Sequence, residues 1–238
     1  MSTLNPDATL RLVYAEGTRV DRTRWIAQRR KLNEERMDTL FAPDYDNHWG
    51  EVCPTHERML NEFLGRCTPG GKVLDAACGT GKFWPIVLGS GRSVLGIDQS
   101  GGMLAKAEEK HPEVPTLKLG MQEMRFENEF DGVICVDAME FVFPEDWPRV
   151  LSNFRHASKE GTPLYLTVEL TSPEDIEEAL EKGESMGLPV VEGEHAHEGG
   201  YHYYPPIEKA RDWIEQAGFS VVGERTGDGY HHFLAVGN

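Results

Sequence analysis

The chain has 238 residues, 39% of them hydrophobic, and 40 acidic residues outweigh 24 basic ones to give a formal net charge of -16. Such a surface repels nucleic-acid phosphates and anionic lipids, so the composition argues against both kinds of partner. Four cysteines without a C-x-x-C pair, no apolar run of membrane-spanning length, and an N-terminus unlike a signal peptide predict a reduced, cytoplasmic protein.

The first predicted elements are helices. Residues 22–41 carry apolar side chains at roughly helical spacing among many charges. The basic residues of this segment are Arg22, Arg24, Arg29, Arg30 and Lys31. Because Glu34 and Glu35 follow at once, we interpret the cluster as a solvated helix face and not as a nucleic-acid site. A second helix is expected from Pro54, a residue favoured in the first turn, to about Gly65.

From residue 72 the chain alternates between strand and helix patterns. Strands are predicted over 72–77, 93–98, 116–120, 130–137 and 162–170, with helices over 100–111 and 145–157 among the intervening segments. Ser100 is the expected cap of the first of these helices. This alternation predicts a doubly wound, mostly parallel sheet with helices on both faces.

After the fifth strand the pattern changes. An acidic helix is predicted over 172–187, followed by a His/Tyr-rich segment and another helix over 207–217. The last strands, 219–225 and 230–238, lie about five residues apart, too close for a crossover helix, so they should pair antiparallel. We expect residues 1–53 to form a helical lid segment, 54–238 the core, and 171–205 an insertion forming a cap on the substrate side.

The stretch "KVLDAACGTGKFW" predicts a strand, a glycine loop and a helix. Gly79 and Gly81 let the backbone bend and approach a ligand, and a helix begun at Phe83 would present backbone N–H groups to it. No P-loop motif is present. A dinucleotide-binding fingerprint would need a small residue where Trp84 stands, and the antiparallel ending argues against that fold again.

Several segments together resemble the class I S-adenosylmethionine (SAM)-dependent methyltransferases. "VLDAACGTGK", "LGIDQSGGMLAKAE" and "FDGVICVDAMEFV" are similar to three of their motifs, and the closing hairpin is similar to their signature ending. The resemblance covers about residues 45–236. It implies a Rossmann-like, seven-stranded sheet with an antiparallel last strand, and SAM bound across the carboxyl ends of the strands, with S-adenosylhomocysteine (SAH) as product.

The resemblance also implies a set of cofactor-binding residues. These candidates are Tyr45, Trp49, Asp75, Ala77, Gly79, Gly81, Asp98, Gln99, Met103, Met121, Gln122, Glu123 and Val136. Asp98 follows Gly81 by 17 residues at a strand end, where a carboxylate can accept both ribose hydroxyls. Asp75 would contact the methionine amino group through water or instead hold the N–H groups of the loop.

The sequence leaves two possible roles for the residues expected at the adenine ring and for those of the lid. Met103 and Met121 would enclose the adenine ring or else fill the core. Either residue of the pair 122–123 would meet the adenine edge. Tyr45 and Trp49 would close over the sulfonium, where an aromatic face attracts positive charge, or they would pack the N-terminal helix onto the sheet.

Candidates for catalysis are an acid and several histidines. Glu140 is expected near the acceptor, with a helix-start carboxylate as its alternative role. His202, and less readily His231 or His232, could act as general base. The segment with His195, His197 and His202 could instead bind a metal, although methyl transfer needs none.

These features together predict a methyltransferase acting on an O or N atom of a small-molecule metabolite, as a monomer or homodimer. The alternatives are a non-catalytic regulatory protein that binds SAM or a nucleotide, and a metal-assisted enzyme that uses the histidine-rich loop.

Overall fold

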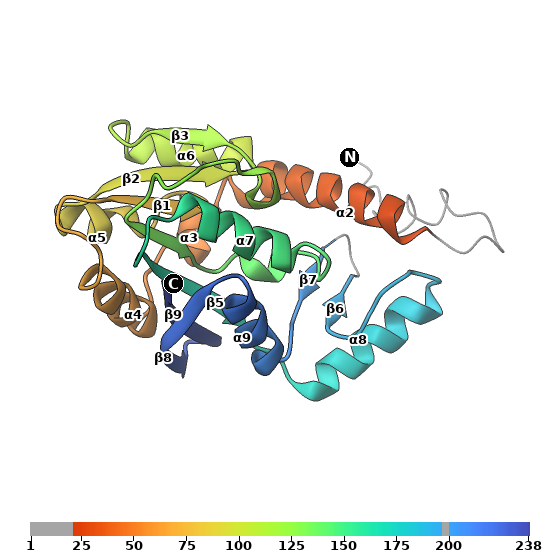
Figure 1. The fold of residues 1–238 in the computed structure, drawn as a ribbon. Coiled ribbons are helices and arrows are strands. Elements are labelled where there is room, and N and C mark those ends of the chain that lie inside the picture. Colours follow the sequence, from red (N-terminus) through yellow and green to blue (C-terminus); the bar gives the residue numbers. More distant parts are fainter. Residues whose placement is uncertain (1–20, 197–199) are drawn as a thin grey trace.

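The computed structural model describes residues 21–196 and 200–238, and within them it contains one seven-stranded sheet and one two-stranded ribbon (Figure 1). The strands of the large sheet are β1 (Lys72–Ala76), β2 (Ser93–Asp98), β3 (Thr116–Lys118), β4 (Gly132–Cys135), β5 (Pro163–Glu169), β8 (Phe219–Gly227) and β9 (Tyr230–Gly237). Their order is β3-β2-β1-β4-β5-β9-β8. Strands β1 to β5 pair in parallel, whereas β9 runs antiparallel to both β5 and β8. The predicted doubly wound sheet with an antiparallel ending is confirmed.

The helices fall where apolar periodicity and capping residues predict them. They are α2 (Arg22–Arg36), α3 (Tyr45–Trp49), α4 (Pro54–Leu64), α5 (Trp84–Gly89), α6 (Gly101–Lys110), α7 (Trp147–Ala157), α8 (Pro173–Ser185) and α9 (Ile207–Gln216). Short turns of other pitch are η1 (Met37–Phe41), η2 (Met121–Glu123) and η3 (Met139–Phe141). The Ser100 hydroxyl accepts a hydrogen bond from the backbone N–H of Met103, which confirms it as the cap of α6.

Two apolar layers enclose the sheet because successive residues of each buried strand face opposite sides. One layer joins Leu74 and Val133 to buried side chains of α7 and α9. The other joins Val73 and Ile134 to buried side chains of α4, α5 and α6. The carboxyl ends of the parallel strands are thereby held at one edge of a rigid core.

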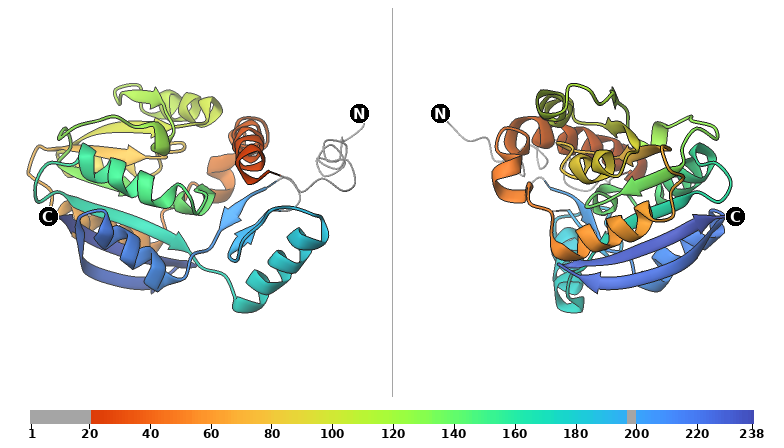
Figure 2. Two further views of the ribbon diagram at one scale, coloured as in Figure 1. Left: turned by 45° about the vertical axis from the view of Figure 1, so that its right-hand side comes forward. Right: turned by 90° about the vertical axis from the view of Figure 1, so that its left-hand side faces the viewer.

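A cap lies beside this edge and is built from α2 and the insertion after β5. Within the insertion, β6 (Glu194–His195) and β7 (His202–Tyr203) pair antiparallel. Figure 2 shows α2 and this ribbon standing together at the carboxyl ends of the sheet strands. Trp25 of α2 makes edge-on contacts with Phe143 and with Tyr201, at centroid distances of 5.9 and 6.1 Å.

The basic residues of α2 correct our expectation of a solvated face. Arg29 is fully buried and donates to the carbonyl of Ala196 at 3.2 Å. Arg22 forms an ion pair with the buried Glu194 at 2.8 Å. Arg24 and Lys31 are exposed. Arg22 and Arg29 thus join the N-terminal helix to the insertion, and Arg30 pairs with Asp146. Of the predicted lid segment 1–53, residues 1–20 lie outside the described residues.

Within residues 21–196 and 200–238, no helix combines the length and the apolar character needed to cross a membrane.

Candidate active site

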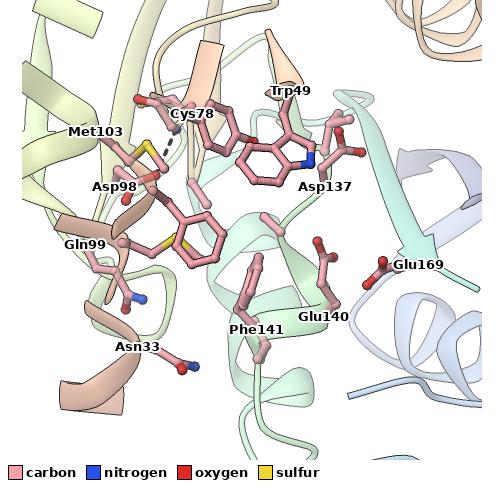
Figure 3. A pocket seen from close by; sticks show the side chains of 18 of the residues that line it. Asn33, Trp49, Cys78, Asp98, Gln99, Met103, Asp137, Glu140, Phe141 and Glu169 are labelled. Atoms are coloured by element: carbon pink, nitrogen blue, oxygen red, sulfur yellow. Dashed lines mark hydrogen bonds between the residues drawn. The ribbon is translucent and has the colours of Figure 1, made fainter. Parts of the chain in front are cut away.

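A cavity of about 580 Å³ lies at the carboxyl ends of the parallel strands. It is lined by residues that directly follow β1, β2 and β4, by the end of β5, and by side chains of α2, α3 and the insertion. Figure 3 shows Asp98, Gln99 and Met103 at one side of this space and Glu140, Phe141 and Glu169 at the other. A crevice at the carboxyl ends of an open α/β sheet is where such folds bind ligands.

The loop after β1 bends sharply at three residues with positive φ, namely Ala77 (62°), Gly79 (54°) and Gly81 (75°). A Cβ built on Gly79 would meet no atom within 4 Å, so the backbone there borders open space, as a ligand cradle requires. A Cβ on Gly81 would lie 2.7 Å from the ring of Trp84. Gly81 is not among the residues that line the cavity and makes room for Trp84, and a cofactor contact there stays a prediction.

Asp98 ends β2 with its carboxylate at the cavity wall and only 9% of its surface exposed. One oxygen accepts the Gly79 N–H at 2.9 Å and the other accepts the Ser100 N–H at 2.8 Å. Burial raises the pKa of this carboxyl, while these backbone N–H groups oppose that rise. Each oxygen retains lone-pair capacity for a ribose hydroxyl, so the carboxylate fits SAM while also fixing the loop.

Asp75 has a partner that the sequence did not suggest. It is 2% exposed, and its carboxylate accepts the indole N–H of Trp84 at 2.8 Å. Burial raises its pKa to about 7. The alternative in which Asp75 holds the N–H groups of the loop is therefore not what the structure shows, although the residue does line the cavity.

The adenine end of the cavity resolves the choice between neighbouring residues. Met103 and Met121 are 4% and 8% exposed, yet both line the cavity, so they fill the core and border the ligand space together. Gln122 also lines it, whereas Glu123 does not. Adjacent side chains of the tight turn η2 point in different directions, and the Gln122 amide lies against Gly120. The structure thus favours Gln122 over Glu123.

Helix α3 carries both predicted lid residues. Tyr45 and Trp49 line the cavity, with their rings 5.4 Å apart, and Trp49 is 47% exposed. Between them, Asp46 accepts the Thr80 hydroxyl of the glycine loop at 2.5 Å and binds the Lys110 ammonium at 2.7 Å. This carboxylate connects α3 to the glycine loop that follows β1.

A second carboxylate anchors the preceding turn. Asp38 accepts hydrogen bonds from the Ser100 hydroxyl at 2.6 Å and from the Gly102 N–H at 2.9 Å, at the start of α6. The segment from 37 to 49 is therefore attached to the start of α6 through Asp38 and to the glycine loop through Asp46.

An ion-pair group at the centre of the cavity was not anticipated from the sequence. Asp137 accepts from His56 at 2.8 Å and from Lys82 at 2.8 Å. Its backbone has a φ of 53°, and its N–H donates to the Thr167 hydroxyl at 2.8 Å. Burial would raise the pKa of Asp137, but His56 and Lys82 outweigh burial and hold it below its usual value. Neither His56 of α4 nor Lys82 at the end of the glycine loop could be assigned to this group from the sequence, because the contacts join segments far apart in the chain.

The acceptor end contains two of the predicted catalytic residues. Glu140 lies in η3, is 4% exposed and lines the cavity. Burial, and then the charge of Glu169, raises its pKa well above the usual value. His202 of β7 lines the same space, with its Nδ1 2.8 Å from the Tyr204 hydroxyl and 3.4 Å from a Glu169 oxygen. Phe141 contacts the His202 ring edge-on at 4.9 Å.

His231 is not in the site, which corrects its assignment as a catalytic candidate. Its ring nitrogens lie 2.9 Å from Glu224 and 3.1 Å from the Thr226 hydroxyl, on the surface of the β8–β9 hairpin. Neighbouring side chains of a strand point to opposite faces, so His232 turns inward and its Nδ1 lies 2.9 Å from the Tyr165 hydroxyl. Neither histidine is among the residues that line the cavity.

Among the described residues of the histidine-rich loop, no group of three potential metal ligands converges. His195 and His202 are cross-strand partners of β6 and β7, and His197 lies outside the described residues. In the part of the chain that the structure describes, the one trio with metal-binding groups within 4.8 Å of one another is Cys53, His56 and Asp228.

Comparisons with known proteins agree with this geometry. Residues 73–161 match the family model described as a methyltransferase domain. An uncharacterized methyltransferase from Bacillus cytotoxicus is 26% identical over 199 residues, which cover 82% of this chain and 89% of that protein.

Two solved structures share the fold at low sequence identity. The first is the Burkholderia thailandensis 1,6-didemethyltoxoflavin-N1-methyltransferase with bound 1,6-didemethyltoxoflavin and SAH (TM-score 0.67, 15% identity, covering 94% of this chain and 93% of that one). The second is the magnesium protoporphyrin IX methyltransferase from Synechocystis with bound SAM (TM-score 0.62, 16% identity, covering 88% of this chain and 97% of that one).

The strand order, the open glycine loop beside Asp98 and the matched methyltransferase domain lead to one assignment. SAM is the cofactor, and the chain is a SAM-dependent methyltransferase with a Rossmann-like fold.

Proposed function

We propose that this enzyme transfers the methyl group of SAM to a nitrogen or oxygen atom of a small molecule. The observation that carries the proposal is the continuity of the cavity, which extends from Asp98 and Met103 at the cofactor end to Glu140 and His202 at the other. Its volume of about 580 Å³ is in the range of small-molecule pockets.

The acceptor end is roofed by the cap. Gly200, Tyr201 and His202 of the insertion line the cavity, as does Asn33 of α2. Tyr201 is itself held by a 2.7 Å hydrogen bond to Glu194, the residue that pairs with Arg22. We propose that residues 171–205 form the substrate-side insertion and that the roof favours compact acceptors over polymers.

The cofactor side supplies binding and alignment. Asp98 would hold the ribose, Gln122 would meet the adenine edge, and Tyr45 and Trp49 would cover the sulfonium. Methyl transfer is an in-line displacement, so the main task of these residues is to aim the methyl group at the acceptor end. No metal is part of this proposal, and action in the cytoplasm as a monomer or homodimer stays a prediction.

The test is SAH formation from SAM with separate panels of small amines and alcohols, of RNA, and of proteins. We expect turnover with small molecules only. Turnover confined to RNA or protein substrates would refute the small-molecule proposal while leaving the methyltransferase assignment intact.

A further inference from the structure

The Glu140 side chain stands out as a buried carboxylate with an unused oxygen. It is 4% exposed, and its Oε2 atom has no hydrogen-bond partner among the described residues. Buried polar atoms are almost always hydrogen-bonded, and an exception at a cavity wall indicates a group that a ligand satisfies. Glu140 lies in the turn directly after β4 and lines the cavity.

A second carboxylate faces the first. Glu169 ends β5, lines the same cavity, and points toward Glu140 in Figure 3. It is also near His202 and hydrogen-bonded by the Tyr204 hydroxyl. Two carboxylates arranged in this way repel each other unless a proton or a cation lies between them.

His202 is the one described cationic group paired with these carboxylates, 3.4 Å from a Glu169 oxygen. Other cationic side chains that line the cavity have other partners. Lys82 and His56 both bind Asp137, at 2.8 Å each. At the α2 wall, Arg30 forms an ion pair with Asp146. The acceptor end of the cavity therefore has an excess of negative charge that the described protein groups do not neutralise.

Aromatic rings surround the two carboxylates. Tyr230 and Tyr45 line the cavity, and the charge of Glu140 contributes to a raised pKa for both phenols. Phe141 forms a further wall beside His202. Carboxylates within aromatic walls suit an organic ammonium group better than a bare metal ion, which needs several converging oxygen or nitrogen ligands. The described trio of potential metal ligands, Cys53, His56 and Asp228, lines the same cavity but includes neither Glu140 nor Glu169.

We propose that the methyl acceptor is a small basic amine, bound as an ammonium group by Glu140 and Glu169, and that its nitrogen receives the methyl group. This inference rests on the proposed function and narrows it to N-methylation. Tyr45, the predicted lid residue over the sulfonium, lines the same cavity as Asp98 and Glu140.

The chemistry balances with the groups in place. The bound ammonium gives one proton to the Glu140 carboxylate, and the nitrogen lone pair becomes free. That lone pair forms the new carbon–nitrogen bond as the methyl–sulfur bond of SAM breaks. The electron pair of the broken methyl–sulfur bond stays on sulfur, which gives SAH. Glu140 then releases the proton to solvent. A carboxylate whose pKa is raised by burial is suited to take and release this proton.

The binding test uses the intact enzyme loaded with SAH and paired probes that differ only in the polar group, such as 2-phenylethylamine with 2-phenylethanol and further amine–alcohol pairs of other shapes. Calorimetry should show at least one amine binding about tenfold or more tightly than its alcohol. Glu140→Gln should remove that preference, whereas the matched control Glu178→Gln, on the exposed face of α8, should retain it. If no amine binds more tightly than its alcohol, the inference is overturned.

Turnover separates this inference from the proposed function. SAH formation with amines that drops at least about a hundredfold in Glu140→Gln, with SAH affinity retained and the melting temperature not lowered, supports N-methylation. SAH formation with alcohols or phenols that is equal in parent and Glu140→Gln would overturn the amine inference and leave the proposed function standing. SAH formation with RNA or protein alone would overturn both.

Discussion

Replacement of Asp98 by Asn tests the cofactor site most directly. The substitution keeps the shape of the side chain and removes its charge. In the parent, both carboxylate oxygens accept backbone N–H groups, from Gly79 and from Ser100. An amide can offer only one oxygen, so its NH₂ group must face one of these donors, and the ribose loses an ionised acceptor.

The expected loss follows from these contacts. A hydrogen bond to a charged group contributes about 1.5–3 kcal/mol and a neutral one about 0.5–1.5 kcal/mol. Weakening two ribose hydrogen bonds in this way costs about 2–3 kcal/mol, so the Kd for SAH should rise roughly 30- to 150-fold. Part of that loss comes from the disturbed Gly79 loop and does not involve the ribose.

A thermodynamic cycle separates the two contributions. Calorimetry would compare SAH with its 2′-deoxy analogue in the parent and in Asp98→Asn, with Asp212→Asn, on the exposed face of α9, as a control. We expect the 2′-hydroxyl to contribute at least about 1 kcal/mol more in the parent than in Asp98→Asn. An equal contribution in both proteins would show that Asp98 does not bind the ribose, and our assignment of the cofactor site would be wrong.

Three further predictions concern the lid, the cap and the buried acid. Tyr45→Ala or Trp49→Ala should weaken SAH binding roughly tenfold because a ring over the sulfonium end is lost, with little change in melting temperature; a loss of stability alone would make these rings core residues. His202→Ala should lower turnover and leave SAM affinity nearly unchanged, so a collapse of SAM affinity in calorimetry would assign the insertion to the cofactor site. Glu140 has a raised pKa, so the folded state holds its proton longer than the unfolded chain, and stability should fall as pH rises from the ordinary carboxyl pKa through the raised one. Calorimetry should therefore give Glu140→Gln a higher melting temperature than the parent above that pH window and the same melting temperature below it. Each kcal/mol of recovered stability adds about 2–4 °C. Identical pH profiles for parent and variant would contradict the burial of a charge.

The sequence by itself determined the sheet and the cofactor loop. Alternating patterns, a short connection between the last strands, and glycines after an apolar strand are local signals, because each depends on residues within one or two elements. The same locality explains why Asp98 and Gln99 could be placed at a strand end. Their position follows from the strand that precedes them.

Only the tertiary structure decided which charged side chains are buried and where they point. Arg29 looked solvated among its charged neighbours, yet it lies fully buried against the insertion about 170 residues later, at a backbone carbonyl of that segment. His202 and His231 were both candidate bases, and strand pairing places His231 at the surface and His202 at the cavity. The burial of the unpaired Glu140 and its raised pKa also depend on the tertiary structure, because two strands, η3 and the cap must come together to bury it beside Glu169. Charge burial is a property of contacts between distant segments, and no local pattern of residues records it.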